Sequence, residues 1–130
     1  MNQNYLVDTS ALYPLVLNFR EKVFTASKKL KILDLTFYEV GNVLWKHYRK
    51  GKIENLNITA ETFKEILDSL EKLKAEDFIE ILKIATKENL TFYDAAYINV
   101  AKKHKLTLVS ADKEMLRKYS EAIPPEKVKI

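Results

Sequence analysis

The sequence contains no cysteine, only two glycines and only three prolines among its 130 residues. Without cysteine, the chain has no disulfide bonds, cysteine-ligated zinc, iron–sulfur clusters or thiol catalysis. The scarcity of glycine and proline argues against long flexible linkers, and the lack of a glycine-rich phosphate-binding loop argues against ATP or nucleotide-cofactor functions. No uncharged stretch is long enough to span a bilayer, and no basic segment precedes the interrupted apolar start. We therefore expect a cytoplasmic protein with no signal peptide and no membrane partner.

The composition is that of a soluble globular chain. Hydrophobic residues make up 47% and charged residues 31%, and 130 residues fit one domain, expected over 1–130. Twenty-two Lys and Arg against eighteen Asp and Glu give a formal charge of +4. This mild basic bias permits a polyanionic partner such as RNA without identifying one.

Apolar runs alternate with helix-period segments along the chain. We expect strands at 5–7, 31–35, 106–109 and, as an edge strand, 128–130. We expect helices at 9–17, 21–28, 36–50, 77–87, 91–104 and 112–119. A further long helix should begin with Thr59 as its cap and carry five apolar side chains on one face: Phe63, Ile66, Leu67, Leu70 and Leu73. A strand near Lys74 is left open, because the pattern does not show one. Strands separated by helices predict an α/β protein with a parallel sheet covered on both faces.

Four acidic residues stand where such a sheet would bring them together. Asp8 ends the first strand, Asp112 follows the strand at 106–109, and Glu39 and Asp94 each lie in the first turn of a helix. In parallel α/β sheets, helix N-termini gather at the carboxyl ends of the strands, where these folds place their sites. Crowded carboxylates repel one another unless a cation lies between them. All-oxygen ligands favour Mg²⁺ or Mn²⁺, which can activate water and stabilise charge on a phosphodiester.

Each of these acids has a plainer interpretation as a helix cap. Thr36 and Thr91 lie three residues before Glu39 and Asp94, which matches the capping box. The other two acids could cap the helices that follow them. A carboxylate can cap through one oxygen and bind a metal through the other, so both interpretations stay open.

The neighbours of Glu39 and Asp94 favour a functional role. The residues four positions before and after Glu39 are Leu35 and Val43, and those around Asp94 are equally apolar, so neither acid has a helical ion-pair partner. Burying a carboxylate among apolar side chains is costly unless the carboxylate has a partner, so a partner such as a metal ion is expected.

Four short motifs carry a resemblance to a known family. VDTSA around Asp8 resembles the opening motif of PIN domains, and LTFYEVGNVL around Glu39 resembles their second acidic helix. LTFYDAAY around Asp94 is similar to the third motif, and LVSADK around Asp112 to the fourth, with Ser110 where Thr is commoner. The motifs occur in family order and at family spacing over nearly the whole chain.

The resemblance implies a three-layer α/β/α PIN-like fold with a central parallel sheet. It implies endonucleolytic cleavage of RNA that depends on Mg²⁺ or Mn²⁺. The residues that match the family's catalytic and metal-binding quartet are Asp8, Glu39, Asp94 and Asp112, and those that match supporting positions are Ser10, Asn42 and Ser110. By hypothesis, Asp8 and Asp94 hold the principal metal. The small size resembles the VapC toxin branch, whose members are usually homodimers neutralised by a cognate antitoxin.

The end of the helix at 36–50 mixes bases with aromatic residues. Arg49 and Lys52 are candidates for RNA contact, while Trp45 could equally serve an antitoxin or dimer groove. We otherwise expect an ordinary helix that packs four side chains inward: Phe37, Val40, Leu44 and Tyr48.

Three alternative functions stay open. A non-toxin PIN nuclease that processes RNA would lack a neighbouring antitoxin gene. A non-catalytic module that binds RNA or a partner would fail an activity assay. A divalent-metal phosphatase ranks last, because the segment after Asp8 lacks the second aspartate of a paired Asp-x-Asp site.

Overall fold

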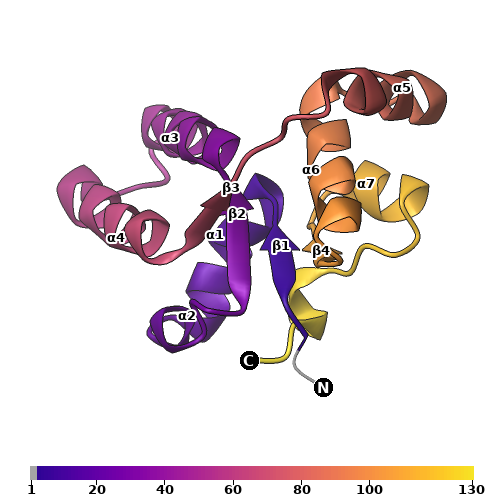
Figure 1. Ribbon diagram of the computed structural model, residues 1–130. Helices are drawn as coiled ribbons and strands as arrows, with labels where there is room; N and C mark the ends of the chain where they lie inside the picture. Colours follow the sequence, from indigo (N-terminus) through magenta and orange to yellow (C-terminus); the bar gives the residue numbers. More distant parts are fainter. Residues whose placement is uncertain (1–2) are drawn as a thin grey trace.

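A fully parallel four-stranded sheet lies between two layers of helices in the computed structural model, which describes residues 3–130 (Figure 1). The strands are β1 (Tyr5–Val7), β2 (Leu30–Leu33), β3 (Glu71–Leu73) and β4 (Thr107–Val109), in the order β3-β2-β1-β4. The helices are α1 (Thr9–Phe19), α2 (Lys22–Thr25), α3 (Asp34–Arg49), α4 (Leu56–Ser69), α5 (Phe78–Glu88), α6 (Phe92–Lys103), α7 (Lys113–Lys118) and the 3₁₀ turn η1 (Pro125–Lys127). The predicted α/β class and α/β/α layering are confirmed. None of these helices, within residues 3–130, is long and apolar enough to cross a membrane.

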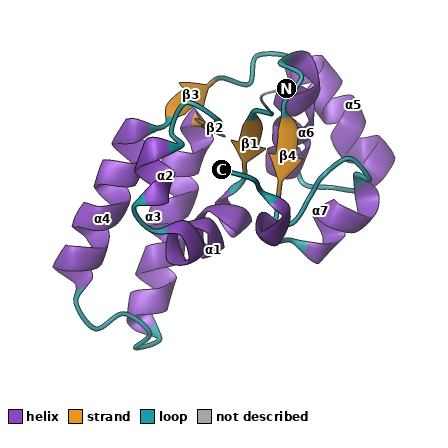
Figure 2. Ribbon diagram, turned by 90° about the horizontal axis from the view of Figure 1, so that it is seen from below, coloured by secondary structure: helices purple, strands orange, loops and turns teal. Residues whose placement is uncertain are grey.

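The period of two along β1 separates the core into two clusters. Tyr5 and Val7 pack into one cluster with α1 to α4, whereas Leu6 packs into the other with α5 to α7. All three side chains have no exposed surface. Figures 1 and 2 show these two groups of helices on opposite sides of the sheet. Because both faces are covered, the central strand β1 is apolar throughout, as buried parallel strands require.

Helix α6 lies between the sheet and α5, and it is buried almost all round. Its residues 95–101 are all buried. The small side chains of Ala95, Ala96 and Ala101 allow this close packing. Helix α6 therefore gives Asp94 and Tyr97 a rigid support.

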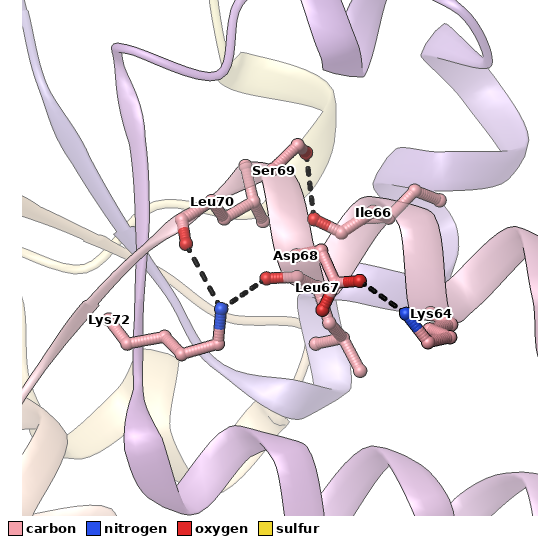
Figure 3. Close-up of polar contacts among 7 residues, drawn as sticks. All are labelled: Lys64, Ile66, Leu67, Asp68, Ser69, Leu70 and Lys72. Atoms are coloured by element: carbon pink, nitrogen blue, oxygen red, sulfur yellow. Dashed lines mark hydrogen bonds and ion pairs between the residues drawn. The ribbon is translucent and has the colours of Figure 1, made fainter.

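The end of α4 differs from the prediction, which had placed Leu70 and Leu73 on a longer helix. The helix ends one residue before Leu70, and Leu73 belongs to β3. The last carbonyls of a helix lack partners within it. Here the Ser69 hydroxyl donates to a carbonyl one turn earlier, and the Lys72 ammonium donates to the carbonyls of Leu67 and Leu70 (Figure 3). These bonds end the helix and lead the chain into the edge strand.

The start of α4 and the second strand also differ from the prediction. Asn55, not Thr59, caps α4, and its side-chain oxygen accepts the N–H of Ile58 at 3.0 Å. The second strand ends at Leu33, and α3 begins directly at Asp34. Helix α2 is shorter than the expected 21–28.

The predicted edge strand at 128–130 is wrong. These residues are not in a strand, and Val128 instead packs into the cluster beside α1. The sheet is extended on the far side of β4 by Ile123, which forms an isolated parallel bridge with Val109. Long-range pairing of this kind leaves no local pattern.

Candidate active site

Asp8 lies at the carboxyl end of β1 and caps α1. Its Oδ1 accepts the Ser10 hydroxyl at 2.7 Å and the N–H of Ala11 at 3.0 Å, and the side chain is buried. Ser10 Oγ lies 3.3 Å from Ser110 Oγ and accepts the N–H of Ala111 at 2.9 Å. The two serines therefore join the start of α1 to the segment after β4 and hold Asp8 in place.

Glu39 does not act as a cap. Thr36 is inside α3 rather than at its cap, and its hydroxyl accepts the N–H of Leu33 at 3.2 Å. Glu39 Oε1 instead accepts the hydroxyl of Thr9 at 2.8 Å and that of Tyr97 at 2.7 Å, and Tyr97 also lies 2.7 Å from Thr36 Oγ1. Three helices thus converge on one carboxylate. Sequence analysis had missed the roles of Thr9 and Tyr97, although both lie within the quoted motifs.

Asp94 and Asp112 stand at the starts of α6 and α7. The N–H of Asp94 donates to Thr91 Oγ1 at 3.1 Å, so Thr91 caps the helix as predicted. Asp112 caps α7 by accepting the N–H of Glu114 on Oδ1 at 2.8 Å, and its own N–H donates to Ser110 Oγ at 3.1 Å. The capping interpretation therefore holds for Asp112, as it does for Asp8, through one oxygen of each carboxylate.

All four carboxylates line one hollow of about 500 Å³. Its lining comprises Asp8, Thr9, Ser10, Tyr13, Pro14, Glu39, Asn42, Val43, His47, Asp94, Tyr97 and Asp112. The four acids that the topological argument placed at one edge of the sheet therefore line the same hollow. Ser10 and Asn42, which were predicted from the family resemblance, line it as well. Ser110 is not part of this lining, but its hydroxyl contacts two residues that are: the Ser10 hydroxyl and the N–H of Asp112.

Burial and mutual repulsion raise the pKa of two carboxyl groups in this hollow. Burial raises the pKa of Asp8 to about 6, an effect that hydrogen bonds from its neighbours oppose and the charge of Asp94 reinforces. Burial, then the charge of Asp112, raises the pKa of Asp94. Burial also raises the pKa of Tyr97, so this hydroxyl stays protonated and donates to Glu39. Four carboxylates that line one hollow repel one another, a conflict that a bound cation would relieve.

The donor set of the hollow fits a hard divalent cation. Carboxylate oxygens are what Mg²⁺ and Mn²⁺ prefer. Among residues 3–130, no three acidic or histidine side chains already converge on one metal position.

The predicted RNA contacts do not lie at the hollow. Arg49 stacks over the ring of Trp45, 5.1 Å from its centroid, and neither Arg49 nor Lys52 is in the lining. His47 and Tyr13 form the wall instead, with ring centroids 5.4 Å apart. No sequence signal singled out this pair.

The inward-facing stripe predicted for α3 is half correct. Val40 and Leu44 are buried, as expected, but Phe37 and Tyr48 are 57% and 49% exposed. Helix α3 packs against α1, α4 and β2, and these contacts leave both side chains about half exposed.

Comparison with known proteins identifies the family. A PIN domain family model matches residues 5–121. The chain is 41% identical over 126 residues to Exonuclease VapC9 of Pyrobaculum aerophilum, which covers 97% of this chain and 93% of that protein. It is 32% identical over 109 residues to Ribonuclease VapC3 of the same organism, covering 81% of this chain and 82% of the relative.

Solved structures show the same fold. The crystal structure of PAE2754 from Pyrobaculum aerophilum matches with a TM-score of 0.87 and 41% identity over 97% of this chain and 86% of that one. A toxin–antitoxin complex from Klebsiella pneumoniae matches with a TM-score of 0.64 and 16% identity, over 96% of this chain and 100% of that one. With the PIN model spanning most of its length and VapC9 related along nearly all of it, the chain belongs to the PIN-domain family and, within it, to the VapC proteins.

Proposed function

We propose that the protein is an Mg²⁺- or Mn²⁺-dependent endoribonuclease and the toxin of a VapBC-type pair. The observation that carries the proposal is the convergence of four carboxylates on one hollow, where Asp8 and Asp94 have raised pKa values. Charge concentrated in this way is typical of a site that binds a divalent cation. The names of two relatives, Exonuclease VapC9 and Ribonuclease VapC3, support the hydrolysis of nucleic-acid phosphodiesters but differ in mode.

The residues of the hollow have separable roles in this proposal. Asp8 and Asp94 hold the principal cation, while Glu39 and Asp112 complete its surroundings or orient water. A bound divalent cation supplies Lewis-acid stabilisation of the charge that develops on the phosphodiester. Tyr97 and Thr9 donate to a single oxygen of Glu39, which leaves the other oxygen free to orient a water molecule. The N-termini of helices at this edge favour an anionic phosphate.

RNA cleavage after metal removal tests the proposal. Protein stripped with EDTA is given Mg²⁺ or Mn²⁺ and incubated with linear RNA, circular RNA and single-stranded DNA of matched sequence. We expect metal-restored cutting of circular RNA, which has no ends, and none by Asp94→Asn. Asp68→Asn is the matched control, because Asp68 lies exposed on α4 in a pair with Lys64.

The outcomes separate the remaining alternatives. Cutting of linear but not circular RNA would replace the endonuclease by an exonuclease, and cutting of DNA alone would remove RNA as the substrate. Metal binding without any cleavage would favour a module that only binds RNA or a partner.

An antitoxin is the partner that we propose for a groove between α1, α2 and α4. This groove, of about 320 Å³, exposes Leu17, Phe24 and Ile58 beside the buried Phe63. An apolar helix or extended segment fits such a lining. Leu17→Glu should abolish co-purification with the product of a neighbouring small gene while leaving RNA cleavage intact.

A homodimer is proposed from the exposed apolar side chains of α3 and α5. Tyr38, Trp45, Phe78 and Ile79 are each more than half exposed, and exposed large apolar side chains often mark an interface. Light scattering at defined concentration should give twice the 15.2 kDa chain mass. Ile79→Lys should yield the monomer, and an unchanged dimer would remove α5 from the interface.

A further inference from the structure

A second hollow, of about 630 Å³, lies between α5, α6 and the end of α7. Its most frequent lining residue is lysine, contributed by all three helices: Lys83, Lys87, Lys102, Lys103 and Lys118. Only two acidic residues, both glutamates, line it with them. This hollow is therefore positively charged, in contrast to the hollow lined by the four carboxylates, which we call the acidic hollow. The lysines repel one another unless an anion binds between them. We call this second hollow the lysine hollow.

Not all five lysines are engaged by the protein itself. Lys118 pairs with Glu114 at 2.9 Å, and Lys103 lies 3.5 Å from Asp77. The other three make no ion pair with any residue in 3–130. The ammonium of Lys102 lies over the ring of Tyr119, 5.5 Å from its centroid, but no anionic group in the described part of the chain neutralises it. The charge of these three lysines is therefore available to a ligand.

A buried amide in the same lining points to a ligand independently of the charge. Asn99 is only 8% exposed, and its Oδ1 is the one buried side-chain oxygen or nitrogen in residues 3–130 without a hydrogen-bond partner. Native proteins rarely leave such a group unpaired. An amide can accept on one side and donate on the other. It therefore suits a ligand with both kinds of group, such as a ribose hydroxyl beside a phosphate.

The position of the lysine hollow relates it to the acidic hollow. Helix α6 begins beside Asp94 and runs to Lys102, eight residues later in the chain. At 1.5 Å per residue this is roughly 12 Å, about three or four nucleotides of a stacked strand. Helix α7 likewise runs from Asp112 to Lys118. Each of these two helices therefore has a carboxylate of the acidic hollow near its start and a lysine of the lysine hollow near its end.

We propose that the lysine hollow binds the sugar–phosphate backbone of the RNA a few nucleotides from the site of cleavage. Lys83 and Lys87 lie on successive turns of α5, and Lys102 of α6 lines the same hollow, so the positive charges are spread over more than one phosphate position. That arrangement favours a polymer backbone over a single small anion. The inference rests on the proposed function, because it takes RNA as the substrate.

The salt dependence of RNA binding tests the lysine hollow separately from catalysis. All variants are built on Asp94→Asn, so that RNA is not cut, and binding of a labelled 12-mer is measured by fluorescence anisotropy at several salt concentrations. Each phosphate contact on a single strand contributes about 0.7 to the slope of log K against log salt. Lys83→Gln with Lys87→Gln should reduce that slope by about 1.4 and weaken binding on the order of ten-fold at low salt.

Matched variants give the expected contrasts. Lys127→Gln with Lys129→Gln removes two exposed lysines that flank Val128, and it should leave the slope unchanged. Val128 packs in the core cluster of α1 to α4, on the opposite face of the sheet from the lysine hollow. Asn99→Ala should weaken binding a few-fold with the slope unchanged, because no charge is lost. Thermal unfolding confirms that each variant is folded.

Two results would overturn the proposal. A slope that falls equally in the two double-lysine variants would show a diffuse basic surface. A lysine-dependent affinity for inorganic phosphate without any change in the RNA slope would show a small-anion site. RNA cleavage by the protein without these substitutions is measured separately. If the slope depends on the lysines but the protein cuts no RNA, the backbone-binding site stands and the proposed nuclease activity is wrong.

Discussion

Replacing Asp8 by Asn should stabilise the metal-free protein at neutral pH and remove its response to divalent cations. Asp8 is 5% exposed, and at pH 7 it is ionised although burial disfavours its charge. Asn keeps an oxygen that can accept from Ser10 and Ala11, and it caps helices as well as Asp does. The substitution therefore removes the charge and little else.

The size of the effect follows from the pKa of Asp8. Burial raises this pKa from 3.8 to about 6. Each unit of difference between the folded and unfolded states is worth about 1.4 kcal/mol, so the ionised carboxyl costs the folded state up to about 3 kcal/mol. Between these two pKa values the folded protein keeps a proton that the unfolded chain has lost. The contribution of Asp8 to stability therefore falls as the pH rises from about 4 to 6 and is constant above that range.

Urea unfolding in EDTA at pH 4 and pH 7 measures this difference. We expect Asp8→Asn to match the wild type at pH 4 and to exceed it at pH 7, with Asp68→Asn unchanged at both. Mn²⁺ should raise the thermal midpoint of the wild type but not that of Asp8→Asn. A variant less stable at pH 7, or one equally stabilised at both pH values, would refute the argument from burial.

Three further predictions concern the groups around the site and the end of α4. Tyr97→Phe removes a hydrogen-bond donor to Glu39 and should lower kcat about ten-fold with little change in KM, as measured by initial rates on RNA. An unchanged kcat would show that Glu39 does not need this hydrogen bond. Ser110→Ala removes a hydrogen bond that lowers the pKa of Asp8, so carboxyl NMR titration should find that pKa above the wild-type value of about 6. Lys72→Met leaves the carbonyls of Leu67 and Leu70, at the end of α4, without their ammonium donor and should reduce the free energy of unfolding by about 1 kcal/mol in urea titration. No loss would mean that water replaces the ammonium.

Much of the fold could be predicted because local patterns carry it. The apolar run of β1, the largely apolar run of β4 and the capping Thr91 of α6 are short-range signals, and each is found where expected. Strand β3, near the position left open in the prediction, has no recognisable pattern because two of its three residues are charged, and an edge strand needs little apolar surface. Leu70 and Leu73 matched the helical period although the helix had already ended.

The alignment of the four acids could be predicted, but not what holds them. Asp8 and Asp112 end or follow strands, and the parallel topology sends both to the same edge. The capping box proposed for Glu39 was wrong, because α3 begins two residues earlier than the pattern indicated. Its partner Tyr97 is 58 residues away in the sequence.

The sequence by itself determined the chemical character of the site: four carboxylates, no cysteine, and positions at the ends of strands and the starts of helices. These depend on residue type and on rules that hold for every parallel sheet. Only the tertiary structure decided that Asp8 is buried with a raised pKa and that Thr9 and Tyr97 donate hydrogen bonds to Glu39. It also decided that lysines from three helices line one hollow with Asn99. Burial and desolvation arise from packing between segments distant in the chain, and no local pattern records them.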